Sequence, residues 1–96
     1  MKHATAAALD QIDALLQRVR DLETLRERTR GVFYRGSTAF LHFHEDPAGM
    51  FADLRTDNGW ARYPVNRTSD QASLVRAIKA SLGPRKQLST RNTRAS

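Results

Sequence analysis

The sequence predicts a small α+β domain in which a long N-terminal helix, a four-stranded antiparallel β-meander and a C-terminal helix follow one another. Three observations support this fold class. Residues 4–30 contain no glycine or proline, turn signals divide residues 31–66 into short apolar runs, and Gly83-Pro84 ends a second amphipathic stretch. We expect both helices to pack on one face of the sheet.

The first helix is expected over Ala4 to Arg30, where Ala, Leu, Gln, Arg and Glu dominate. Its apolar stripe follows helical spacing through Leu9, Ile12, Leu16 and Val19. A helix of about 24 residues would run ~36 Å, whereas a strand of about six residues spans ~20 Å. The surplus stripe needs another partner, which makes a homodimer one expectation.

Four strands are expected over residues 31–35, 38–44, 49–55 and 60–66. Tight turns are expected to join these strands, because the connecting segments are rich in turn-forming residues. The segments are Gly36-Ser37, Glu45 to Ala48, and Thr56 to Gly59. A four-residue turn at Glu45 to Ala48 would place His44 opposite Gly49. The order is therefore a meander in which sequence neighbours pair.

The second helix is expected to begin at Thr68, with Gln71 completing a capping box, and to end before Gly83-Pro84. Residues 1–83 then form a single domain. Residues 84–96 hold one leucine and are otherwise polar and basic, which predicts a disordered basic tail. That tail carries four of the basic residues and no acid, so most of the formal net charge of +6 lies outside the folded part.

The composition excludes several classes of site. The chain has no cysteine, so a disulfide framework and a thiolate metal site are both impossible. No apolar run approaches the ~18 residues of a membrane span. We therefore expect a cytoplasmic protein with no membrane contact and no bound cofactor.

Alternation along the expected strands separates two faces. One face is apolar and would carry the helices. The other face combines aromatic, arginine and histidine side chains, and such a patch is typical of an interaction site. The expected binding surface consists of Phe33, Arg35, Phe40, His42, His44, Phe51, Arg55, Trp60 and Arg62.

The same face carries the candidate metal ligands His42, His44 and Asp53, because imidazole pairs at this spacing bind zinc or iron when an acid converges with them. The expected register places Phe51 opposite His42 and reaches Asp53 only diagonally, ~7–8 Å away. It also places Arg62 opposite Asp53 as an ion-pair partner. The sequence therefore favours surface histidines over a metal site.

Three functions follow in order of preference. The first is a non-enzymatic interaction module that binds a protein partner or a second copy of itself, since Phe, Trp and Arg concentrate at binding hot spots. The second is single-stranded nucleic-acid binding, with the aromatic side chains as stacking platforms. The third is a small metal-dependent enzyme using His42 and His44. The chain has no GxSxG, P-loop or HExxH motif, so no catalytic residue is assigned.

Overall fold

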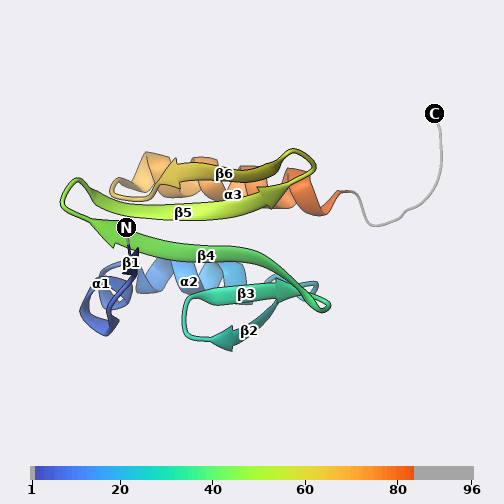
Figure 1. Ribbon diagram of the computed structural model, residues 1–96, viewed down its shortest axis with the longest axis horizontal. Coiled ribbons are helices and arrows are strands. Elements are labelled where there is room, and N and C mark those ends of the chain that lie inside the picture. The colour runs from blue at the N-terminus through green and yellow to red at the C-terminus, as the bar shows by residue number, and fades with distance from the viewer. Residues whose placement is uncertain (1, 84–96) are drawn as a thin grey trace.

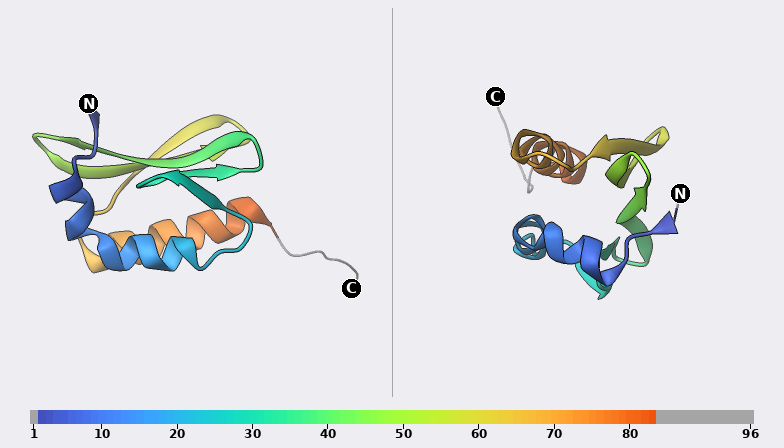
Figure 2. Two further views of the ribbon diagram at one scale, coloured as in Figure 1. Left: turned by 90° about the horizontal axis from the view of Figure 1, so that it is seen from below. Right: turned by 90° about the vertical axis from the view of Figure 1, so that its left-hand side faces the viewer.

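The computed structural model describes residues 2–83, which form two layers (Figure 1). The helices are α1 (Ala6–Gln11), α2 (Asp13–Arg20) and α3 (Thr68–Leu82), and the strands are β1 (Lys2–His3), β2 (Arg26–Thr29), β3 (Val32–Arg35), β4 (Thr38–Asp46), β5 (Gly49–Thr56) and β6 (Gly59–Pro64). Strands β2 to β6 pair in chain order as an antiparallel sheet, and β1 pairs with β4. Figure 2 shows the three helices on one side of this sheet. The predicted α+β class is confirmed, and the face that no described helix covers is called the open face.

The predicted helix over Ala4 to Arg30 is wrong in its second half. The helical stretch is interrupted at Ile12, whose φ of −113° and ψ of 26° leave the helical region, and it ends at Arg20. The chain then turns and forms β2. Leu25 accounts for the change, because the turn places this side chain in the core with 8% exposure, whereas a continued helix would carry it away from the apolar stripe.

Glu27 fastens β2 to its surroundings. Arg20 donates through Nε to Glu27 Oε1 (2.5 Å) and through Nη2 to Oε2 (3.0 Å), and the N–H of Gly31 donates to the same Oε2 (2.8 Å). Gly31 has a φ of 81° and supports the reversal between β2 and β3, not a helix end. The prediction of four strands is therefore wrong, since β2 adds a fifth strand to the meander and the two-residue β1 pairs with β4. The helix is also short enough that the length mismatch behind the expected homodimer does not arise.

The turn between β4 and β5 is shorter than predicted. Asp46 pairs with Gly49, so Pro47 and Ala48 alone form the turn. The Asp46 carboxylate accepts a hydrogen bond from the N–H of Ala48 (2.8 Å), which closes the turn locally. The shift moves β5 by two residues along β4.

A shift of two residues keeps every side chain of β5 on its predicted face and changes its neighbour on β4. His42 lies opposite Asp53, and His44 lies opposite Phe51. The predicted pairing of His42 with Phe51 is therefore wrong. The predicted pairing of Asp53 with Arg62 on β6 is confirmed.

An irregularity between β3 and β4 changes part of the predicted open face. Tyr34 pairs with Ala39 and Phe33 pairs with Leu41, which leaves Phe40 without a Cα partner in β3. Such a bulge breaks the period-two alternation. Phe33 is 0% exposed and Phe40 is 3% exposed, so both belong to the core and their predicted placement on the open face is wrong.

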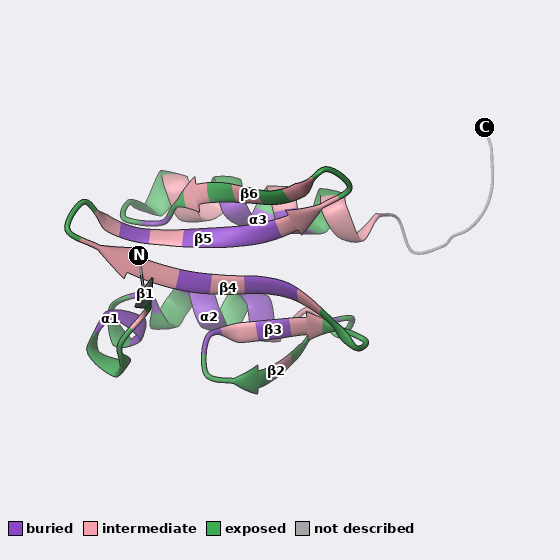
Figure 3. Cartoon of the chain, viewed as in Figure 1, coloured by how far each residue is buried: buried purple, intermediate pink, exposed green. Residues whose placement is uncertain are grey.

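The core lies between the helices and the middle of the sheet, where buried residues concentrate in β4, β5, α2 and α3 (Figure 3). The fully buried helix side chains are Leu15, Leu16, Val19, Leu74 and Ile78. The predicted span of the second helix from Thr68 to before Gly83 is confirmed. The predicted capping box of Thr68 and Gln71 is wrong, because Arg67 is the N-cap and pairs with Asp70. The predicted disordered tail, residues 84–96, lies outside the described residues.

Replacing Phe33 by alanine is expected to lower the free energy of unfolding by about 3–5 kcal/mol, because it removes a fully buried aromatic ring and leaves a cavity. Phe51→Ala is the matched control, since Phe51 is only partly buried, and it should cost markedly less. Urea unfolding of both variants measures the difference. Equal losses would contradict the placement of Phe33 in the core.

Candidate metal centre

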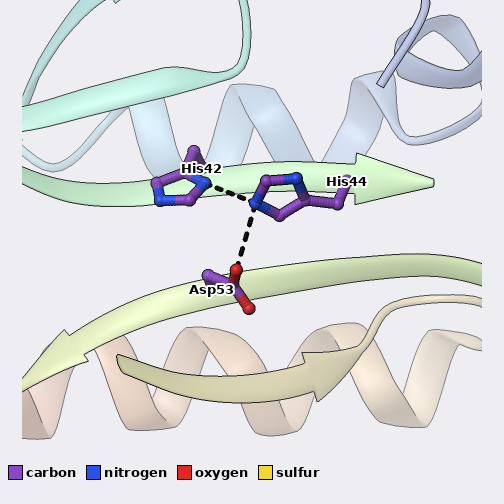
Figure 4. Close-up of side chains that lie close together, drawn as sticks. All are labelled: His42, His44 and Asp53. Carbon is purple, nitrogen blue, oxygen red and sulfur yellow. Dashed lines mark hydrogen bonds and ion pairs between the residues drawn. The ribbon is translucent and has the colours of Figure 1, made fainter. Parts of the chain in front are cut away.

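Two histidines and one aspartate converge on the open face. His42 and His44 alternate along β4 and project to the same side, and Asp53 lies across from His42 on β5. Figure 4 shows the three side chains pointing toward one another. His42 Nδ1 lies 2.7 Å from His44 Nε2, which lies 3.0 Å from Asp53 Oδ2. Three potential ligand atoms therefore lie within 4.8 Å of one another.

Arg62 fixes the Asp53 carboxylate from the neighbouring strand. Its Nε donates to Oδ1 (2.8 Å) and its Nη2 donates to Oδ2 (3.0 Å), a bidentate arrangement that specifies the plane of the carboxylate. Asp53 is only 7% exposed. The hydrogen bonds from Arg62 lower the pKa of Asp53 against the opposing effect of burial, so the carboxylate is ionised at neutral pH.

His42 lies between His44 and an aromatic neighbour on β6. Its ring is 4.6 Å from the Trp60 ring, in an edge-on contact, and Arg55 stacks over the same Trp60 at 4.4 Å. Burial lowers the pKa of His42, and the nearby His44 lowers it further. The imidazole is therefore neutral at neutral pH and has a nitrogen lone pair that can bind a metal ion.

No arrangement of protons satisfies His44. A ring nitrogen holds either one proton or one lone pair in the ring plane. With the proton on Nε2, His42 and Asp53 must share it; with Nε2 bare, its lone pair faces the ionised carboxylate of Asp53 at 3.0 Å. In either case Nδ1 is buried and finds no hydrogen-bond partner among residues 2–83. The cluster therefore holds more acceptor atoms than its protons can serve.

The third histidine of the chain, His3, lies beside this cluster. His3 pairs with His44 across β1 and β4. Its ring centroid is 5.2 Å from that of His44 and 5.8 Å from that of His42. The residues around His3 carry no sequence signal of this position, because the pairing joins two strands that lie about 40 residues apart in the chain. Only the fold brings the three imidazoles together.

The rest of the predicted binding surface is divided. Phe51, Arg55, Trp60 and Arg62 lie on the open face with the two histidines, as their cross-strand pairing requires. Phe33 and Phe40 lie in the core. The side chain of Arg35 extends from β3 to the C-terminal end of α3, where it donates to the carbonyls of residues 81 (3.4 Å) and 82 (3.3 Å). The sequence-predicted site residues therefore form one smaller patch, with three of the nine elsewhere.

His42 and Asp53 are in the protonation states that metal ligands require. Metal ligands must be neutral imidazole and ionised carboxylate, and these are the states that their surroundings favour in His42 and Asp53. Ligating carboxylates are in turn held by hydrogen bonds from a second layer of residues, as Arg62 holds Asp53. The ligand atoms offer two nitrogens and one oxygen to a cation.

Comparisons with known proteins give no family assignment for this arrangement. No family model matches the sequence, and neither a curated protein nor a solved structure shows significant similarity to it. Among the described residues, no helix is long and apolar enough to cross a membrane.

Arg62→Gln is expected to raise the pKa of Asp53, because it removes the hydrogen bonds that lower it. Ionised Asp53 stabilises the fold above its unfolded-state pKa, and this contribution is lost as the pH falls through the lowered folded-state pKa. The variant should therefore lose less stability between pH 7 and pH 2 than the wild type. A carbon-13 NMR titration of the carboxyl group and urea unfolding across that pH range measure both effects.

Arg55→Gln is the matched control, because Arg55 occupies the same face but contacts Trp60 and the carbonyl of Ala39 instead of the carboxylate. It should leave the Asp53 titration unchanged. Identical titrations in Arg62→Gln and the wild type would show that Arg62 does not control this carboxylate.

Proposed function

We propose that this domain binds a divalent transition-metal ion on the open face through His42, His44 and Asp53. The observation that carries the proposal is the crowding of acceptor atoms around His44 Nε2, at 2.7 Å from His42 Nδ1 and 3.0 Å from Asp53 Oδ2. A cation among these atoms would bind all three of them, whereas a single proton on Nε2 has to be shared by His42 and Asp53. The sequence favours surface histidines over a metal site, because the expected register separates the three residues.

The donor types favour zinc. Two imidazole nitrogens and one carboxylate oxygen suit Zn²⁺, whereas Mg²⁺ and Ca²⁺ prefer oxygen ligands throughout. The chain has no cysteine, so sites that need soft thiolate ligands are excluded.

Two of the three donor separations are close to those of a tetrahedral site. Ligand atoms at ~2.0–2.1 Å from a tetrahedral Zn²⁺ lie roughly 3.3 Å apart. The distances of 2.7 Å and 3.0 Å at His44 Nε2 therefore have to widen by a few tenths of an ångström. The widest separation among the three ligand atoms, 4.8 Å, has to narrow by about 1.5 Å in the same rearrangement.

Zinc is expected to bind the tag-free chain with one-to-one stoichiometry, and His42→Ala, His44→Ala and Asp53→Asn should each weaken binding by at least about tenfold, since changes even in the second layer cost 10–100-fold. Isothermal titration calorimetry measures the affinity. Asp57→Asn is the matched control, because Asp57 is an exposed acid in the turn after β5. Wild-type affinity in all three site variants would contradict the proposal, as would the absence of binding by the wild type.

A second candidate function is the interaction module predicted from the sequence, with a second copy of the chain or another protein as the partner. Trp60 supports it: this side chain is 44% exposed, a large apolar group beside Arg55 on the open face. Single-stranded nucleic acid has less support, because Phe33 and Phe40, two of the four expected stacking platforms, are buried.

For self-association, the wild-type mass in solution is expected to rise with protein concentration, and Trp60→Ala should remain monomeric because it removes the apolar contact. Analytical ultracentrifugation over a wide concentration range measures this. A wild type that stays monomeric throughout would contradict the self-association form of this candidate.

A further inference from the structure

We infer that His3 is the fourth ligand of this metal, so that β1 closes the coordination sphere and the ion has a structural role. The inference rests on the proposed metal site and adds to it a residue, a coordination number and a mechanical consequence. It is carried by the position of His3, which backbone pairing sets beside His44 on the open face.

The pairing specifies where the His3 side chain lies. Directly opposed residues of antiparallel strands project to the same face, so His3 projects with His44. Two further hydrogen bonds hold the chain after β1: the N–H of Ala4 donates to the Phe43 carbonyl (3.2 Å), and the N–H of Thr5 donates to Glu45 Oε1 (2.6 Å). The third imidazole is thereby kept at the edge of the cluster.

The ring spacing matches a shared ion. Two imidazoles bound to one tetrahedral Zn²⁺ have centroids roughly 5 Å apart, because each nitrogen is ~2.0–2.1 Å from the metal. The three centroid distances here are 4.6 Å for His42–His44, 5.2 Å for His3–His44 and 5.8 Å for His3–His42. The centroid distance expected for a tetrahedral site lies within this range. His3 is exposed, so its ring is free to turn toward the ion.

Coordination number decides what the metal can do. Catalytic zinc sites keep three protein ligands and an open position for water, whereas structural sites are closed by four. His3, His42, His44 and Asp53 together supply four. The site then leaves no position for a reacting water, which agrees with the absence of a catalytic motif in the sequence.

A closed site would also fasten β1. This strand has two residues, Lys2–His3, and joins the sheet through β4 alone. A bond from His3 to the metal ties it to β4 and, through Asp53, to β5. The metal would therefore act as a clamp across three strands, β1, β4 and β5.

The test compares cobalt- and zinc-loaded wild type with His3→Ala, and uses Lys2→Ala, the adjacent residue of β1, as the matched control. His3→Ala should bind Zn²⁺ at least about tenfold more weakly. Its Co²⁺ form should gain an azide-dependent change in the visible spectrum, since the fourth position is open, and free imidazole should restore the wild-type spectrum. Wild type and Lys2→Ala should show no azide effect.

Hydrogen exchange gives an independent readout. Zinc should slow exchange at the Ala4 amide in the wild type, because the clamp holds β1 against β4, and should do so much less in His3→Ala. Equal zinc affinity in both proteins, with azide binding in both, would overturn the four-ligand site and leave the three-ligand proposal standing. Failure of the wild type to bind zinc at all would instead overturn the proposed function itself.

Discussion

The pairing of β4 with β5 is the constraint on which the site depends. A turn of Pro47 and Ala48 places Asp53 opposite His42, and Arg62 on β6 then holds the Asp53 carboxylate in a bidentate contact. These neighbours follow one another in the meander, so the register is fixed by local turns and needs no long connection. The same strands present their alternate side chains to the core, which ties the geometry of the cluster to the stability of the fold.

The open face is thus more than the uncovered side of a sheet. Buried polar groups are stable only when their partners are complete, and His44 has a surplus of acceptors around Nε2 and an unpartnered Nδ1. A charged ion on this face would complete the Nε2 side of the network. Trp60 contacts His42 on the β6 side of the cluster, and Arg55 stacks over Trp60.

Much of this fold could be predicted from the sequence, and the failures have physical causes. The apolar stripes of the helices and the two faces of the strands follow from sequence periodicity. Leu25 shows the limit of helix propensity: the run of helix-forming residues continues past Arg20, but the chain leaves the helix and buries Leu25 in the core. The turn after β4 was the decisive ambiguity, because two-residue and four-residue turns preserve the same faces. Alternation alone could therefore place His42 and Asp53 on one face without making them neighbours. The position of His3 could not be predicted from the sequence, because it depends on the pairing of β1 with β4, for which the sequence near His3 carries no signal.

Nitrogen-15 NMR of the imidazole rings during a zinc titration tests the central claim most directly, because it observes each histidine ligand atom. The account predicts that His42 Nδ1 and His44 Nε2 shift together and stop shifting at one equivalent of zinc, with a ring nitrogen of His3 following the same course. Ring nitrogens of His42 and His44 that remain unchanged with zinc in excess would contradict it.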